Sequence, residues 1–482
     1  MRPGLTPTVA LLLAGVGCKS VAGPRAVSAS QDPPTVAAPA VNQGTPSTAP
    51  DSAAPAGAIA PAPEAIGAPA GSVYPIHGYM TSTYRGRWTD GDHDNDVYET
   101  LSLDLGDPAR NPWTGHVMAR VDADIDGKGG SSSVFHDLDD TFDGTIQPYL
   151  YDAWMERRDL GSLERVRLGR QTLWDTPVFA WFDGASGETK EFGTAHWKLG
   201  AYGGMPVHLY ESSREGDFLA GAYAEARPWK GGQARLDGMY LEDETELGQH
   251  VNDLWHAGLT QALGTHLRLD GGWTRLEDTN RDVSASATWW DAATDFNVRA
   301  SYFQLLTTQK SLASEVDPYF ATLSELFPYQ QIGLLGSKGV SKNVRVQAGV
   351  DLRRVSDDGD IGQFNRDFER YFGTVTLLDT FSSGITSNLT GEIWNGGGSD
   401  IETWGLDLAK SFSKAFEASA GSVYALYTVE DLTGEERDHV RTYYVRLRWK
   451  RTAATTWDLR FDVEDMDPDP IETVRAGLTW RF

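Results

Sequence analysis

From Tyr74 to the last residue, long segments of the chain alternate between apolar and polar residues. The final segment alternates Val474, Ala476, Leu478, Trp480 and Phe482 with Thr473, Arg475, Gly477, Thr479 and Arg481. A period of two is typical of a β-strand with one apolar face, because successive side chains of a strand point to opposite sides. The chain beyond residue 73 is therefore predicted to be all-β.

The length of these runs distinguishes between two kinds of β-protein. Similar runs cover 117–123, 267–273, 344–352 and 457–463. With their flanks they last roughly 9–13 residues, longer than soluble strands and close to what a tilted strand needs to cross a bilayer. Backbone groups in lipid must all be paired, so such a sheet has to close on itself. We expect a transmembrane antiparallel up-and-down β-barrel.

The connections predict the number of strands. Short turns are expected at 227–232, 263–265, 290–294, 341–343 and 450–452, and longer acidic loops at 89–96, 126–145, 242–253, 277–282, 356–367, 429–438 and 464–472. An up-and-down count gives about 22 strands, and 18 or 20 stay open because barrels of this kind use even numbers. An even number of strands requires a strand over 329–336, whereas the segment 172–202 could hold one strand or two. The short turns should face the periplasm.

The first 73 residues contain no Phe, Trp or Tyr. Residues 1–20 are predicted to be a signal peptide, since Arg2 precedes an apolar stretch at Val9–Val16 that is too short to span a bilayer. Cys18 follows Gly15-Val16-Gly17, which resembles a bacterial lipobox and makes Cys18 a candidate for lipidation; ordinary cleavage further on is the alternative. Residues 21–72 are predicted to be a disordered Ala/Pro-rich periplasmic linker, and 73–482 the barrel.

The composition excludes several classes of protein. A net charge of −26 argues against a nucleic-acid partner, because phosphate contacts need clustered Lys and Arg. A single cysteine excludes a disulfide within the chain. The 16 Trp and 18 Tyr are expected largely in the aromatic girdles at the two membrane interfaces.

Two short segments resemble known barrels. Ala476–Phe482, with Leu478, Trp480 and Phe482 at alternate positions, resembles the C-terminal assembly signal of Gram-negative outer-membrane barrels. Val166-Arg167-Leu168-Gly169-Arg170-Gln171, followed by Trp181-Phe182-Asp183-Gly184, is similar to segments of porin-like and alginate-export-like barrels. The resemblance implies a channel in the cell outer membrane, with outer-membrane lipids, lipopolysaccharide and the barrel assembly machinery as partners.

The polar strand faces supply the candidate pore-lining residues. They are Arg120, Asp122, Arg167, Arg268, Asp270, Arg345, Asp351, Arg353, Arg446, Arg448, Asp458, Arg460, Asp462 and Arg475. Such residues could form charge rings that select ions or sugars, or they could only pair across strands within a wet interior. A barrel this wide also needs narrowing, and the segments 174–187 and 311–327 are candidates for folding inward.

Metal and catalytic motifs are weak. Asp122, Asp124 and Asp126 match the first half of an EF-hand loop, but Ser133 stands where a bidentate Glu is expected, so they are weak calcium candidates. No His-Glu-x-x-His or Gly-x-Ser-x-Gly motif is present. We expect neither a cofactor nor an enzyme.

These observations favour an outer-membrane porin-like channel for passive passage of hydrophilic solutes. Anionic saccharides, or export of an anionic polysaccharide, are the variants that the alginate-export resemblance implies. A structural or adhesion barrel tethered toward the cell wall through residues 21–72 is an alternative from another class, and a barrel hydrolase is a third.

Overall fold

The computed structural model describes residues 74–126, 135, 144–174, 176, 180–208, 213–245, 248–308, 327–356, 367–396, 399–427, 440–465 and 470–482. The predicted signal peptide, Cys18 and the linker 21–72 lie outside these residues, as does all of the segment 311–327 except Phe327. None of the described residues forms a helix long and apolar enough to cross a membrane.

The described chain forms 22 strands. They are β1 (Ile76–Thr89), β2 (Asp92–Leu105), β3 (Trp113–Asp124), β4 (Ile146–Leu160), β5 (Leu163–Leu173), β6 (Ala180–Thr189), β7 (Lys198–Pro206), β8 (Phe218–Ala226), β9 (Gly232–Thr245), β10 (Gly248–Leu263), β11 (Leu267–Leu276), β12 (Thr279–Asp291), β13 (Phe296–Leu305), β14 (Tyr329–Ser341), β15 (Val344–Val355), β16 (Phe368–Thr380), β17 (Ile385–Gly396), β18 (Ser399–Ser411), β19 (Phe416–Tyr427), β20 (Val440–Lys450), β21 (Thr455–Asp465) and β22 (Ile471–Arg481).

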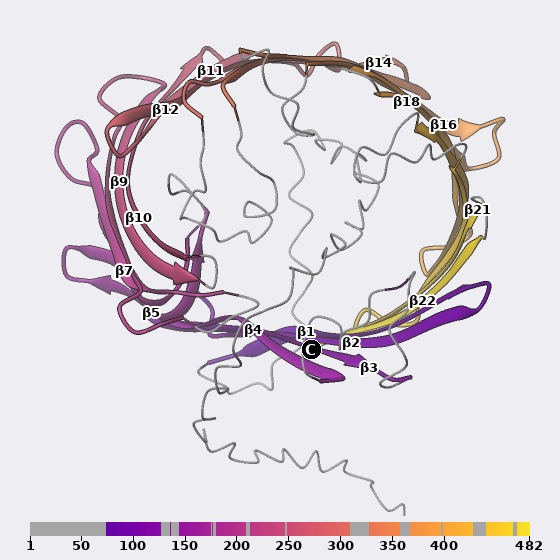
Figure 1. Ribbon diagram of the computed structural model, residues 1–482, viewed down its shortest axis with the longest axis horizontal. Helices are drawn as coiled ribbons and strands as arrows, with labels where there is room; N and C mark the ends of the chain where they lie inside the picture. Colours follow the sequence, from indigo (N-terminus) through magenta and orange to yellow (C-terminus); the bar gives the residue numbers. More distant parts are fainter. Residues whose placement is uncertain are drawn as a thin grey trace, which may run out of the picture. The chain divides into compact units, whose positions relative to one another are not determined.

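Each strand pairs antiparallel with its neighbours in the sequence, and β1 also pairs with β22 (Figure 1). The sheet is therefore a closed up-and-down barrel, which confirms the predicted fold and the count of about 22. The parity argument for a strand at Tyr329 is confirmed by β14, and the ambiguous stretch 172–202 contains β6 and the start of β7. A closed sheet of this length is the architecture of an outer-membrane β-barrel.

Contacts between strands that are not neighbours identify the inner face. The Tyr444 hydroxyl on β20 donates to Asp407 on β18, passing over Gly421 on β19, where an added Cβ would lie 2.5 Å from the tyrosine ring. Side chains two strands apart can meet in this way only on the concave side of a curved sheet. Following the strand registers from this contact assigns each residue to the inner or the outer face.

The outer face is apolar and carries aromatic residues near both ends. Leu, Ile and Val side chains such as Leu334, Leu389 and Leu459 are exposed along its middle. Exposed aromatic residues near the strand ends at the rim of the chain ends include Trp113, Trp289, Trp449, Trp457 and Trp480. A second set, further along the strands toward the other rim, includes Tyr240, Trp255, Tyr371, Trp404 and Tyr443. An apolar band between two aromatic girdles is the surface that a barrel presents to a membrane.

The two rims differ in their connections. All five predicted short turns lie on the rim that also holds the ends of the barrel sequence, Ile76 and Arg481. The strand ends that flank the predicted loops at 126–145, 356–367 and 429–438 lie at the opposite rim, and most residues of these loops lie outside the described ones. The short-turn rim is therefore expected to face the periplasm.

Three of the predicted acidic loops are wrong. Within 89–96, 242–253 and 277–282, only 90–91, 246–247 and 277–278 lie between strands, and the rest belongs to paired strands. Arg85 and Arg87 on β1 form ion pairs with Asp96 and Asp94 on β2, so the polar residues face cross-strand partners. In sequence, polar residues on both faces of a long hairpin look like a loop.

The seam of the barrel is closed by the last residue. The backbone N–H of Gly78 donates to the carbonyl of Phe482 at 3.0 Å, and Phe482 donates back to Gly78 at 3.1 Å. The Trp480 and Phe482 rings pack with their centroids 4.8 Å apart. The segment that resembles an assembly signal thus forms the closing strand, whereas its role in assembly stays a prediction.

One sector of the inner face is not polar, although the sequence predicted a charged lumen face throughout. A buried cluster on β6–β10 comprises Ala180, Phe182, Tyr202, Leu219, Met239, Leu241 and Leu254. Some of these positions alternate with aromatic residues, such as Trp181 and Tyr240, so the sequence pattern does not show which face they occupy.

Candidate functional site

All fourteen predicted pore-lining residues lie on the inner face. They stand on β3, β5, β11, β15, β20, β21 and β22, at positions that alternate with outward apolar residues. Whether they line a conducting pore stays a prediction. Their contacts separate those that serve cross-strand pairing from those that do not.

Most of the predicted arginines have an acidic partner. Arg167 Nη2 lies 2.8 Å from Glu156 Oε2, Arg268 Nη2 lies 2.9 Å from Asp270 Oδ1, and Arg345 Nη2 lies 2.9 Å from Asp295 Oδ2. Further pairs join Arg120 with Asp122, Arg446 and Arg448 with Asp458, and Arg460 with Asp462. Asp351 is contacted by Arg370 Nη1 at 3.4 Å. Ion pairs within one strand or between strands therefore account for most of these charges.

Four arginines form a row across the seam. In the strand registers Arg446 on β20 is opposite Arg460 on β21, Arg460 is opposite Arg475 on β22, and Arg475 is opposite Arg85 on β1. We call Arg446, Arg460, Arg475 and Arg85 the arginine row. Like charges directly opposite each other destabilise a sheet, by up to about 1 kcal/mol for each pair. The packing of the barrel gives no reason for such an arrangement.

Arg475 is the exception within the row. Its three companions pair with Asp458, Asp462 and Asp96, but Arg475 makes no ion pair or side-chain hydrogen bond with any described residue. Its side chain is also exposed on the inner face. The row therefore presents one uncompensated guanidinium between two neutralised ones.

Aromatic rings flank the arginine row. Arg460 lies over the ring of Tyr444, 4.6 Å from its centroid, and Arg85 lies over Tyr98 at 5.3 Å. The Tyr98 hydroxyl donates to Asp96 at 2.8 Å. These stacking contacts hold the neighbouring guanidiniums against the wall.

Arg353 is held differently. Its guanidinium carbon lies 3.6 Å from the centroid of the Tyr329 ring, and its Nε and Nη2 are buried without a hydrogen-bond partner among the described residues. This cation is therefore stacked on the wall on β15, away from the arginine row.

Several inner-wall residues were not predicted from the sequence. Arg85 was missed because its segment adjoins a stretch taken for a loop, although Arg85-Gly86-Arg87 shows the i, i+2 spacing of one strand face. Glu156 and Arg370 were missed because a partner on the next strand is visible only once the register is known. Asp295 was missed because it lies in the turn before β13, whereas its partner Arg345 lies on β15.

A polar cavity of about 500 Å³ lies on another sector of the wall. It is lined by residues of β9–β13, including Arg235, Asp237, His256 and Arg281, and by Thr176 from the β5–β6 connection. Thr176 reaches strands far from its own in the sheet, so at this residue the connection lies inward. The predicted insert 174–187 is shorter than expected, since Ala180–Thr189 is strand β6.

The three weak calcium candidates do not converge as they would in an EF-hand. Asp122 and Asp124 lie in the extended backbone of β3, and Asp122 pairs with Arg120. The carboxylate of Asp126 accepts hydrogen bonds from the backbone and side chain of Asn95 at 3.1 and 3.0 Å. Burial alone would raise the pKa of Asp126, but these hydrogen bonds lower it below its ordinary value. Ser133 lies outside the described residues.

Comparison with known proteins gives similarity in architecture. No protein-family model and no curated protein matches the chain. Among solved structures, a BenF-like porin from Pseudomonas fluorescens Pf-5 is 10% identical with a TM-score of 0.45, over 85% of this chain and 98% of that one. Pseudomonas aeruginosa OpdK with vanillate is 11% identical with a TM-score of 0.40, over 84% and 98%, and Acinetobacter baumannii OccAB3 is 10% identical with a TM-score of 0.43, over 85% and 99%.

Values this low carry no argument about solute or mechanism. The barrel itself shows the fold, through its strand order, its closure and its apolar membrane-facing surface.

Proposed function

We propose that the protein is a passive outer-membrane channel that favours small hydrophilic anions. The observation that supports this proposal is the arginine row, in which the exposed Arg475 makes no ion pair with any described residue. Passage through such a channel needs no catalytic residue and no cofactor.

The electrostatics of the row support a preference for anions. An unpaired guanidinium attracts an anion at 4 Å by about 1 kcal/mol in bulk water and by about 4 kcal/mol at the effective dielectric near a protein surface. A planar guanidinium also presents a fork of donors that matches a carboxylate or phosphate group. Because Arg475 has no acidic partner within the part of the chain that the structure describes, we expect its donors to be available to a passing solute.

A sugar acid is the solute class that this wall suits best. Such a solute combines one carboxylate, for Arg475, with hydroxyl groups that can bond the polar residues of the neighbouring strands. Export of a long anionic polymer is less well supported, because many other charges of the wall are already neutralised in pairs.

Uptake into proteoliposomes tests the proposal. The solutes are glucuronate, glucose and glucosamine, which have similar sizes and differ in charge. We expect glucuronate to enter fastest and glucosamine slowest, with the difference shrinking as the salt concentration rises. If no solute enters through a folded barrel, the structural or adhesion role is favoured; if glucosamine enters fastest, the anion preference is wrong.

A further inference from the structure

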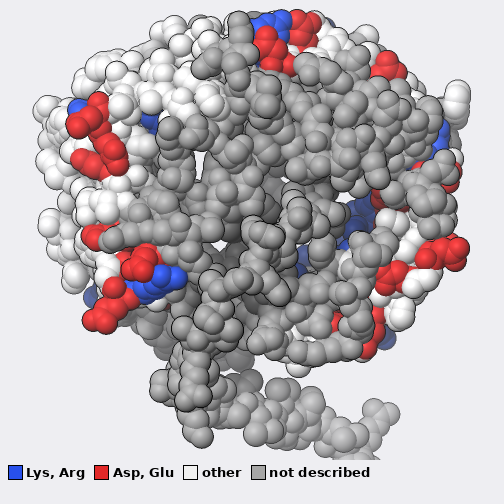
Figure 2. Space-filling model, in the orientation of Figure 1, with Lys and Arg blue, Asp and Glu red and all other residues white. Residues whose placement is uncertain are grey.

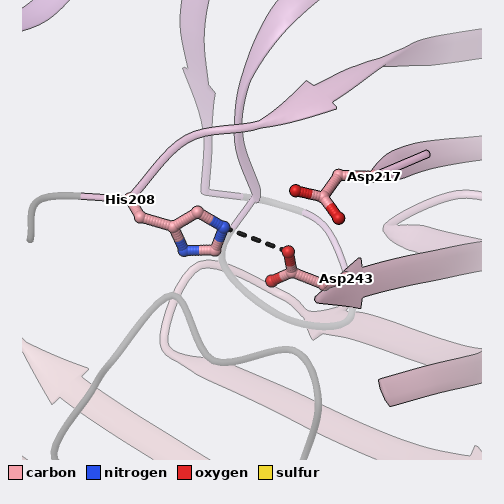
Figure 3. Close-up of side chains that lie close together, drawn as sticks. All are labelled: His208, Asp217 and Asp243. Atoms are coloured by element: carbon pink, nitrogen blue, oxygen red, sulfur yellow. Dashed lines mark hydrogen bonds and ion pairs between the residues drawn. The ribbon is translucent and has the colours of Figure 1, made fainter. Parts of the chain in front are cut away.

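His208, Asp217 and Asp243 come together near the rim opposite the chain ends. His208 follows β7, Asp217 precedes β8, and Asp243 lies near the end of β9. His208 Nε2 lies 3.0 Å from Asp243 Oδ1, and one ligand atom from each of the three residues lies within 4.8 Å of the others (Figure 3). All three side chains point toward one another in the close-up.

The two carboxylates are buried with little compensation. Asp217 is 7% exposed and Asp243 is 2% exposed. Asp217 accepts backbone N–H groups of Arg214 and Glu244 and makes no ion pair within the described residues. Among the described residues, His208 is the side-chain partner of Asp243, and it contacts only the Oδ1 atom of that carboxylate. A buried carboxylate is costly unless it is paired or coordinates a metal. Among the described residues, Asp243 pairs with one imidazole and Asp217 has no charged partner.

The donor set indicates the class of ion. Calcium and magnesium prefer sites made of oxygen ligands, whereas zinc and similar first-row metals take an imidazole together with carboxylates. Tetrahedral zinc at about 2.0–2.2 Å from each ligand atom needs those atoms about 3.3–3.6 Å apart. The three ligand atoms, which lie within 4.8 Å of one another, can therefore reach this separation through small side-chain rotations.

We propose that His208, Asp217 and Asp243 bind a divalent transition-metal ion of the zinc class. The ion joins the connection that follows β7 and precedes β8 to the end of β9. Its three protein ligands leave a fourth position for water. This inference does not depend on what the channel passes.

Metal analysis of the purified full-length protein tests the site. The protein is prepared without a histidine tag, stripped with chelator, exposed to zinc or to calcium, and passed through gel filtration before its metal content is measured. We expect about one tightly held zinc per chain and no retained calcium. The H208A and D243N variants should each weaken zinc binding at least about tenfold.

The matched control is H196A. His196 Nδ1 lies 3.2 Å from Glu191 Oε2 at the other rim, in an exposed pair without a third ligand. H196A should bind zinc as the unchanged protein does. Folding of each variant is checked by heat-modifiable migration in gels, and H208Q replaces H208A if that variant does not fold.

Three results would overturn the proposal. They are retention of calcium rather than zinc, no zinc retained by the unchanged protein, and equal zinc binding by the unchanged protein and a folded His208 variant.

Discussion

Arg475 differs from most arginines of the inner wall in having no acidic partner among the residues that the structure describes. The alternation of the last strand predicted its position on the polar face, but it could not show that Arg460 and Arg85 would stand on either side of it. That arrangement depends on the registers of β21–β22 and of β22–β1, and β1 is nearly 400 residues away in the sequence. Sequence periodicity assigns the face of a residue, whereas only the register supplies its neighbours.

Neutralising Arg475 should weaken the anion preference. We expect the reversal potential of R475Q in a salt gradient to shift toward that of a cation-selective pore, because the row then loses its uncompensated charge. The control is R451Q, which removes the same charge from an exposed turn between β20 and β21. Equal shifts in the two variants would place the selective charge outside the arginine row.

Tyrosine side chains connect strands of the barrel by passing over a glycine of the strand between them. Tyr444 passes over Gly421 to Asp407, and Tyr223 passes over Gly200 to Glu188, where its hydroxyl donates at 2.7 Å. The strands themselves were predictable from periodicity. These tyrosine contacts could not be predicted, because the sequence does not show which aromatic side chain will cover a given glycine.

Filling such a glycine should destabilise the barrel. In G421A the new Cβ would lie 2.5 Å from the Tyr444 ring and 2.7 Å from the carbonyl oxygen of Leu406. We expect a loss of about 1–3 kcal/mol in the free energy of unfolding, measured by urea denaturation in lipid vesicles. G391A is the control, since an added Cβ there meets no atom within 4 Å. Equal free energies of unfolding for the two variants would show that the tyrosine crossing does not contribute to stability.

Removing the last residue should impair closure of the sheet. Deletion of Phe482 removes both backbone hydrogen bonds to Gly78 and the ring contact with Trp480. We expect a smaller fraction of heat-modifiable, folded protein in the membrane, because the seam between β1 and β22 loses its end. F416A, which removes an exposed aromatic from the same rim, should fold normally. Normal folding of the Phe482 deletion would contradict this role.

The described barrel has an apolar outer face and an inner wall that is charged except in the apolar sector on β6–β10. Figure 2 shows acidic side chains gathered at several places around the rim in view. The sequence was sufficient for the closed barrel, the strand number and the short-turn rim, because these follow from periodicity and connection length. It did not show where long hairpins replace loops or where apolar residues face inward, because both depend on contacts between strands.

A 22-stranded barrel encloses more space than the porins that form aqueous channels with 16–18 strands. Electrostatic selection in such a space requires that the arginine row lie on the path of the solute. The size of the barrel alone therefore predicts neither the conductance nor the selectivity.

The most direct measurement is the current through single molecules in a planar bilayer, followed by the reversal potential in a gradient of potassium chloride. The account predicts stable conductance steps and a reversal potential whose sign reports chloride as the more permeant ion. Folded barrels that give no current, or a reversal potential of the opposite sign, would contradict it.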